Sequence, residues 1–338
     1  MSINQTTEIV FNKHNNMLLI GKASTMYGYK EITYGDTVEF VLEKYGDSPL
    51  YQAFKKAKDN GVETVFLLSI EDARDIFDVI GEIVQHDFAY IVPLNIMLTD
   101  YFHDTYNQNR KTYYIEYMLR CMGRWSESVI IATDKHATLF EDQDAFKEYM
   151  NDAAHSFEYY CTSDLRLDNI VFVANHLKDW KNANLAAAIA LCTTDPSQYP
   201  TANFGEPVFY IDRWDNPYNW SYFIAHSDES VTIENLLNFT AAGPDKIVTI
   251  ERIVKVIKRE LDLSEFEGRL YTEYQRVRIL TKLNAYLEHL TGYLLNSFEI
   301  DSVTPIKNAN HTVTILTRFT VWPINSLESC TIEREVHV

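Results

Sequence analysis

Glycine is scarce in this chain, and its 11 glycines are spread thinly over 338 residues. Neither the Gly-x-x-x-x-Gly-Lys phosphate loop nor the Gly-x-Gly-x-x-Gly fingerprint of dinucleotide-binding folds occurs after any predicted strand. The Gly-x-Ser-x-Gly sequence that presents a nucleophilic serine is also absent. These absences argue against a nucleotide-dependent enzyme and against an α/β hydrolase.

Cysteine and clustered histidine are also rare. The four cysteines, Cys121, Cys161, Cys192 and Cys330, form no close pair, so we expect thiols in a reducing compartment rather than disulfides. The ten histidines are scattered, and His-x-x-x-His and Cys-x-x-Cys spacings do not occur. The sequence therefore predicts no metal site and no cofactor.

No apolar run approaches the length that spans a membrane, and the first residues lack a basic region followed by an apolar block. We therefore expect neither a membrane span nor a secretory signal. The formal net charge is −18, which disfavours binding to nucleic acid or to an anionic membrane. A hydrophobic content of 46% is typical of a globular chain with a substantial core.

Between residues 62 and 193, short apolar strands alternate with amphipathic helices. The strands are apolar on both faces, which indicates a sheet covered on both sides by crossover helices. We predict an α/β fold with a covered mixed sheet and extended β arms at both termini. Predicted helices cover residues 37–45, 49–58, 71–85, 110–124, 142–157, 184–191, 251–261 and 270–295. Predicted strands cover residues 62–70, 88–92, 128–132, 170–174 and 246–250.

Both ends of the chain contain strand-like segments. Residues 313–321 and 330–338 alternate between apolar and polar side chains, and Pro323, which has no N–H to donate, separates them. A terminal strand needs a partner, either in its own sheet or in that of another chain. We divide the chain into an N-terminal arm or strand (1–20), an α/β core (21–305) and C-terminal strands with a linking arm (306–338).

Two groups of polar residues follow predicted strands, where α/β enzymes place their ligands. Asp100, His103 and Asp104 form the first group, and residues 134–136 (Asp-Lys-His) form the second. Solvent-exposed loop residues explain both groups equally well, and Asp134 could simply cap the next turn. A small-molecule enzyme with a site near Asp100 and Asp134 stays open as an alternative function.

One local charge feature opposes the acidic balance of the chain. Arg252, Lys255 and Arg259 lie on one face of the predicted helix 251–261, with Lys258 beside them, and the opposite face is apolar. A solvated helix face would explain this stripe. On so acidic a chain, the stripe could instead meet an acidic partner surface.

Several short segments, taken in order, resemble the tail sheath proteins of contractile-tailed bacteriophages and related contractile injection particles. Each segment is short, and their order along the chain carries the resemblance. They are Gly-Lys-Ala at 21–23 after an apolar strand, a helix, Asn-Gly turn and strand over 46–68, Phe-Ala-Tyr-Ile-Val-Pro at 88–93, Tyr-Pro-Thr-Ala-Asn at 199–203, Ile-Val-Thr-Ile-Glu-Arg at 247–252, and closing strands from 303 to 336.

The resemblance implies a structural subunit rather than an enzyme. Identical subunits would stack as six-fold rings in a helical sheath around an inner tail tube, and contraction would drive that tube through a cell envelope. The implied partners are neighbouring sheath subunits, the tube, the baseplate and the tail terminator, without nucleic acid or direct membrane insertion. The implied location is a virion tail assembled in the host cytoplasm, and another structural tail or capsid component is the remaining alternative.

The resemblance also assigns roles to residues. Many family members carry large domains between the Asn-Gly strand and the first crossover helix, whereas here residues 69 and 70 lead straight into the helix. The chain would therefore be a sheath core with no large insertion. Residues that would join the sheets of neighbouring subunits are Ile9, Val10, Phe11, Thr331, Ile332, Glu333 and Val336. Residues that would contact the inner tube are Arg252, Lys255, Lys258 and Arg259.

Overall fold

The computed structural model describes most of the chain, in two compact units. One unit contains the described residues before 235, and the other contains those from 253 onward. Each unit has its own hydrophobic core. The described residues are 16–25, 29–86, 88–104, 110–123, 128–161, 169–194, 201–202, 204–209, 220–225, 231–234, 253–254, 256–258, 260–269, 271–308, 313–324 and 330–337.

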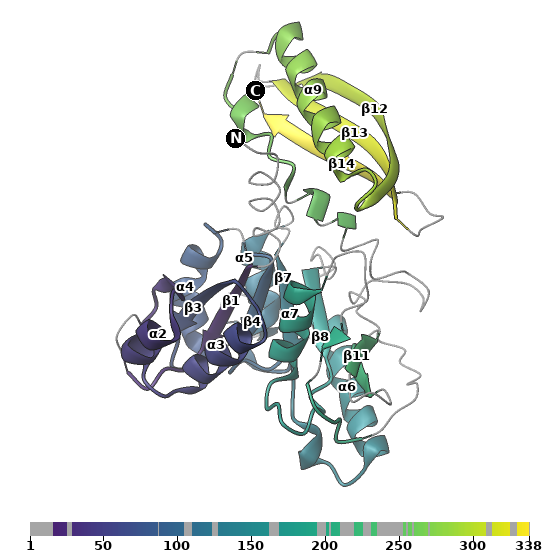
Figure 1. Ribbon diagram of the computed structural model, residues 1–338. Helices are drawn as coiled ribbons and strands as arrows, with labels where there is room; N and C mark the ends of the chain where they lie inside the picture. The colour runs from purple at the N-terminus through teal and green to yellow at the C-terminus, as the bar shows by residue number, and fades with distance from the viewer. Residues whose placement is uncertain are drawn as a thin grey trace. The chain divides into compact units, whose positions relative to one another are not determined.

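A six-stranded sheet in the order β2-β3-β1-β4-β7-β8 forms the centre of the first unit (Figure 1). Five strands run parallel, and only β2 is antiparallel to its neighbour, so the sheet is mixed as predicted. The strands are β1 (Asn16–Gly21), β2 (Ile32–Tyr34), β3 (Thr64–Ser69), β4 (Tyr90–Pro93), β7 (Val129–Thr133) and β8 (Ile170–Val173). A small sheet of β9 (Thr201–Ala202), β11 (Val231–Glu234) and β10 (Tyr222–Ala225) also belongs to this unit.

Three helices of this unit begin after residues whose side chains satisfy free backbone N–H groups. The side chains of Thr37, Ser48 and Asp142 accept hydrogen bonds from the first turns of α2, α3 and α6, and Pro49 occupies the first position of α3. The helices are α2 (Val38–Tyr45), α3 (Pro49–Asp59), α4 (Ile76–Ile83), α5 (Tyr114–Met122), α6 (Gln143–Tyr160) and α7 (Ala183–Thr193), with short 3₁₀ turns η1 (Ala73–Asp75) and η2 (Ala137–Leu139).

Helices cover both faces of the sheet, as the apolar strands predicted. Side chains of α4, α5 and α6 share one core with Leu18 and Ile20 of β1. The helices α3 and α7 contact each other and the sheet but contribute nothing to that core, so they cover the opposite face. Every residue of α7 from Ala183 to Cys192 is buried, and the amide of Asn184 donates to the carbonyl oxygens of Pro93 and Ile131.

Two predicted helices have the wrong limits. Residues 110–113 do not begin a helix but form β6 (Arg110–Tyr113), which pairs antiparallel with β5 (Tyr101–Asp104), and α5 starts only at Tyr114. The predicted helix 270–295 is shorter in the structure, because α9 ends at Leu290 and the next leucines belong to a turn and a strand. Pairing of β6 with β5 delays the start of α5, and the turn that leads into the next strand ends α9.

The second unit packs helix α9 (Glu273–Leu290) on an antiparallel sheet of β12 (Leu295–Lys307), β13 (Val313–Pro323) and β14 (Cys330–His337) (Figure 1). The predicted strands at 313–321 and 330–338 are confirmed as most of β13 and as β14. Pro323, which was predicted to separate them, is instead the last residue of β13 and pairs with Leu295. The long strand β12 was not predicted at its full length. It contains Pro305, which lies opposite Ile315 in the ladder. A 3₁₀ turn, η4 (Ser264–Phe266), also packs into this core.

The predicted segment boundaries fall inside strands. The 20/21 boundary lies in β1, the central strand of the large sheet, and the 305/306 boundary lies in β12. The division between the two compact units lies instead between residues 234 and 253. The separation of arms from core within an assembly stays a prediction. Among the described residues, no helix has the length and apolar character needed to cross a membrane.

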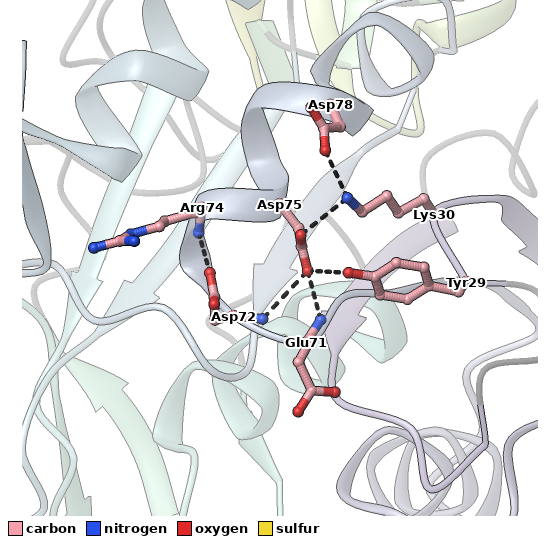
Figure 2. Close-up of polar contacts among 7 residues, drawn as sticks. All are labelled: Tyr29, Lys30, Glu71, Asp72, Arg74, Asp75 and Asp78. Carbon is pink, nitrogen blue, oxygen red and sulfur yellow. Dashed lines mark hydrogen bonds and ion pairs between the residues drawn. The ribbon is translucent and has the colours of Figure 1, made fainter.

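A polar cluster ties the segment before β2 to the start of α4 (Figure 2). The Asp75 carboxylate accepts hydrogen bonds from the Tyr29 hydroxyl at 2.6 Å and from the Glu71 N–H at 2.8 Å, and it pairs with Lys30 at 3.0 Å. Lys30 also pairs with Asp78 at 2.6 Å and has a left-handed backbone with φ 62°. Two anionic partners thus hold a non-glycine residue in an unfavourable conformation.

This cluster predicts a pH dependence of stability. Burial alone would raise the pKa of Asp75, but hydrogen bonds from Tyr29, Lys30 and two backbone amides outweigh it and lower the pKa from 3.8 to about 2. The stabilisation by the carboxylate is therefore fully present above the unfolded-state pKa and is lost as the pH falls through about 2. We expect Asp75→Asn to reduce the free energy of unfolding at pH 6, with a difference that shrinks towards pH 2. Denaturant unfolding across this range measures it, and a pH-independent difference would contradict it.

Candidate assembly interface

Strand β14 carries the residues predicted to link subunits at the C-terminal end. Within one chain it pairs with β13, with Ile332 opposite Phe319 and Val336 opposite Ile315. Both Ile332 and Val336 are 1% exposed and belong to the core under α9. In the single chain they are therefore core residues, and their role as positions shared between subunits stays a prediction.

The face of this sheet that points away from the core is polar. Thr331 and Glu333 lie on it, exposed. The Arg318 Nε donates to the Glu333 carboxylate at 2.6 Å, and the side-chain oxygens of Thr320 and Thr331 are 3.1 Å apart. Exposed pairs of this kind add little stability, about 1 kcal/mol or less each. The register between β13 and β14 is therefore specified mainly by the buried face, which includes Ile332 and Val336.

The edges of the sheet are what make it suitable for assembly. The strand order is β12-β13-β14, and no other described strand pairs with the outer edge of β14. An open edge presents unpaired N–H and C=O groups that can hydrogen-bond to a strand of another chain. The predicted N-terminal linking residues Ile9, Val10 and Phe11 lie outside the described residues.

The basic helix is only partly described. Arg252, Lys255 and Arg259 lie outside the described residues, while Lys258 lies on a helical segment and is partly exposed. Ile253 and Ile257 from the same stretch are fully buried in the core of the second unit. The described residues thus include the apolar inner face, whereas of the predicted cationic stripe they include Lys258 alone, and the stripe stays a prediction. The contact of these residues with a tube stays a prediction.

The strand ends proposed for the alternative enzyme hold a closed hydrogen-bond network. Asp134 is 2% exposed and accepts hydrogen bonds from the Thr99 N–H at 2.9 Å, the Thr99 hydroxyl at 2.8 Å and the Tyr149 hydroxyl. Burial, followed by the charge of Asp134, raises the pKa of Tyr149. Burial also raises the pKa of the nearby Asp100. This network ties the end of β7 to the segment before β5 and to α6.

The other residues of that hypothesis lie elsewhere. His136 contacts the Leu177 carbonyl oxygen at 3.0 Å and the Thr138 hydroxyl at 2.9 Å, next to η2. His103 and Asp104 lie on β5 and line a cavity with aromatic neighbours. Asp100 lies close enough to Asp134 for the two charges to interact, but neither carboxylate lines the cavity that contains His103 and Asp104. Within the described ranges, no group of three or more His, Cys, Asp or Glu side chains could hold a metal ion.

The combination of a covered α/β sheet with a separate helix-on-sheet unit matches known structural proteins. A sheath tail protein from Listeria innocua superposes with a TM-score of 0.62 and 11% sequence identity, covering 100% of this chain and 99% of that chain. A sheath tail protein from Desulfitobacterium hafniense has a TM-score of 0.59 and 10% identity, covering 97% of both chains. The helical sheath of the anti-feeding prophage, solved in its contracted state, has a TM-score of 0.58 and 11% identity, covering 96% of this chain and 90% of that chain.

These likenesses define the class of fold. No protein-family model and no curated protein sequence matches the chain. At 10–11% identity, similarity over almost the full length of each protein is carried by the backbone arrangement rather than by the sequence. The chain has the fold of contractile tail sheath proteins, as its resemblance to that family predicted.

Proposed function

We propose that this chain is the subunit of a contractile sheath, which polymerises helically around an inner tube and shortens to drive that tube through a cell envelope. The observation that carries the proposal is the match to sheath proteins over 96–100% of the chain. The open edge of β14 supports it, because strand addition can connect copies of one chain into a continuous mesh.

The mechanism in this proposal is mechanical. The six-stranded sheet with helices on both faces is a rigid body, since packed cores resist gradual deformation. Backbone hydrogen bonds between strands would keep neighbours attached while such bodies shift between two packings. The tube, the baseplate and the tail terminator would be the further partners, and the particle would be a phage tail or a related injection particle. Electron microscopy of the purified native assembly tests the proposal, because hollow helical tubes support it and a dispersed monomer contradicts it.

The basic stripe gives a prediction about the tube. Reversing two charges with Lys255→Glu and Arg259→Glu should sharply reduce polymerisation on tubes, because a cationic face would become anionic against an acidic partner. Sheathed tubes counted in electron micrographs after co-assembly measure the effect. The matched control is Lys55→Glu with Lys147→Glu, which changes the net charge equally on α3 and α6. Equal sheathing by both variants would refute the tube contact.

A further inference from the structure

The first unit has an aromatic cavity that the proposed function does not use. Its volume is about 780 Å³, and residues of η1, α4, β5 and α5 line it. Phe77, Phe102, Tyr114 and Tyr117 form its apolar wall. The ring centres of Phe77 and Phe102 are 4.8 Å apart, and those of Phe77 and Tyr117 are 4.9 Å apart, both in edge-to-face geometry. These rings therefore pack against one another and form a preformed apolar wall.

Two arginines give this cavity a cationic rim. Arg74 is exposed and lines the cavity, and Figure 2 shows its side chain pointing away from Asp72, Asp75 and Asp78. Among the described residues, no carboxylate pairs with its guanidinium. Arg120 lies on the same rim and shares the buried Glu116 carboxylate with Arg110.

The charges around the rim leave it cationic. Two arginines meet one carboxylate at Glu116, so their guanidinium groups are only partly neutralised. Asp104 also lines the cavity and adds one negative charge. Of the side chains that line the cavity, two arginines, Arg74 and Arg120, stand against one carboxylate, Asp104. A cationic rim around an aromatic wall fits an apolar side chain flanked by acidic ones.

The same unit has an exposed apolar side chain flanked by acidic ones, Leu139, which we call the knob. Among the described residues, three large apolar side chains are more than 70% exposed: Leu139 at 71%, Tyr159 at 73% and Tyr274 at 71%. Leu139 ends η2 and is followed within five residues by the exposed carboxylates Glu141, Asp142 and Asp144, with no basic residue between them.

The other two exposed residues have different surroundings. The ring of Tyr159 contacts that of Tyr160 edge-to-face. The Tyr160 carbonyl oxygen accepts a hydrogen bond from Arg110, and the Tyr160 ring lies 5.3 Å from the Lys111 ammonium. Tyr274 follows Glu273, which is already paired with Arg276. Charge complementarity therefore selects Leu139 as the side chain that fits the cationic cavity.

We infer that the cavity receives Leu139 of a second copy of this chain, with Glu141 facing Arg74. Knob and cavity are different surfaces of one subunit, so the contact is head-to-tail and can repeat from copy to copy. Such a contact generates rings or helical polymers rather than closed dimers. The inference deepens the proposed sheath function, because it names a contact between subunit bodies that is separate from the β14 edge.

Variants that change only one side of the contact test the inference. We expect Leu139→Ala to raise the dissociation constant for self-association roughly tenfold, because the apolar burial of the leucine side chain is lost. Tyr159→Ala removes an equally exposed apolar side chain and should leave self-association unchanged. Sedimentation velocity over a concentration series measures both, and circular dichroism verifies that each variant is folded.

A charge exchange gives the more specific readout. Arg74→Glu and Glu141→Arg should each weaken self-association when measured alone. An equimolar mixture of the two variants should recover it, because each altered side chain then finds an opposite charge on the other copy. Absence of recovery, or wild-type association by Leu139→Ala, would overturn the inference while leaving the sheath function standing. A wild-type chain that stays monomeric at every concentration would overturn both.

Discussion

A variant with Thr320→Cys and Thr331→Cys should form disulfide-linked oligomers when it is oxidised after assembly. When it is oxidised before assembly, it should give only monomers with the disulfide within one chain. The two threonines lie opposite each other on β13 and β14, with their side-chain oxygens 3.1 Å apart and exposed. Facing positions on paired strands lie close to the distance range that a disulfide needs. If β14 of one copy pairs with β13 of a neighbour in the polymer, as the predicted linking role of Thr331 and Glu333 implies, the disulfide must join two chains. If a foreign strand is instead added to the outer edge of β14, the disulfide stays within one chain.

Non-reducing electrophoresis distinguishes the two outcomes, because disulfide-linked oligomers give a ladder and monomers give a single band. Cys121 and Cys330 are replaced by serine in every variant, because one is exposed and the other adjoins Thr331. The control pair is Glu299→Cys with Thr320→Cys, which joins β12 to β13 within one sheet. It should give monomers in both states. If tubes form and the β13–β14 pair still gives only monomers, exchange of β14 between copies is ruled out.

The largest loss of stability is expected at Trp220. Its side chain is fully buried in the core of the first unit, and the indole N–H donates to the Asn151 side-chain oxygen at 2.9 Å. The next residue continues the large sheet, since the Ser221 N–H donates to the Phe172 carbonyl oxygen at 2.7 Å. Trp220→Ala should reduce the free energy of unfolding by about 4 kcal/mol, because it removes a large buried side chain and leaves a cavity.

Denaturant unfolding followed by circular dichroism measures this change. Trp220→Phe is the matched variant, because it keeps most of the apolar packing and loses the hydrogen bond to Asn151. Its expected loss is about 1–2 kcal/mol. Equal effects of both variants would show that the hydrogen bond, and not the packing, anchors this segment. A loss below about 1 kcal/mol for the alanine variant would mean that Trp220 is not part of the core.

Periodicity predicted most of the first unit correctly, since β3, β4, β7 and β8 are apolar on both faces and the helices between them are amphipathic. Local composition also marked helix ends, such as Asn60 at the end of α3. The β5–β6 hairpin was missed because Arg110 to Tyr113 read as the first turn of a helix. Only pairing with residues 101–104 makes that stretch a strand, and such pairing cannot be derived from local propensity.

The assembly interface could be predicted in outline but not in its contacts. Alternation predicted β13 and β14, whereas the burial of Ile332 and Val336 within their own chain depends on α9 packing over them. The aromatic cavity was not predicted, because Phe77, Phe102 and Tyr117 come from three separate elements. A cluster of tyrosines between residues 101 and 117 was the one available signal in the sequence.

Pro305 makes the two edges of the C-terminal sheet differ in their backbone hydrogen-bond donors. A proline within a strand is tolerated where its nitrogen faces away from the ladder, so the border formed by β12 lacks one donor at that position. A foreign strand laid there would leave a carbonyl oxygen without a partner, whereas β14 has no proline along its length. A foreign strand would therefore add to the β14 edge more readily than to the β12 edge. A polymer that grows through this sheet would then have a direction and two distinguishable ends.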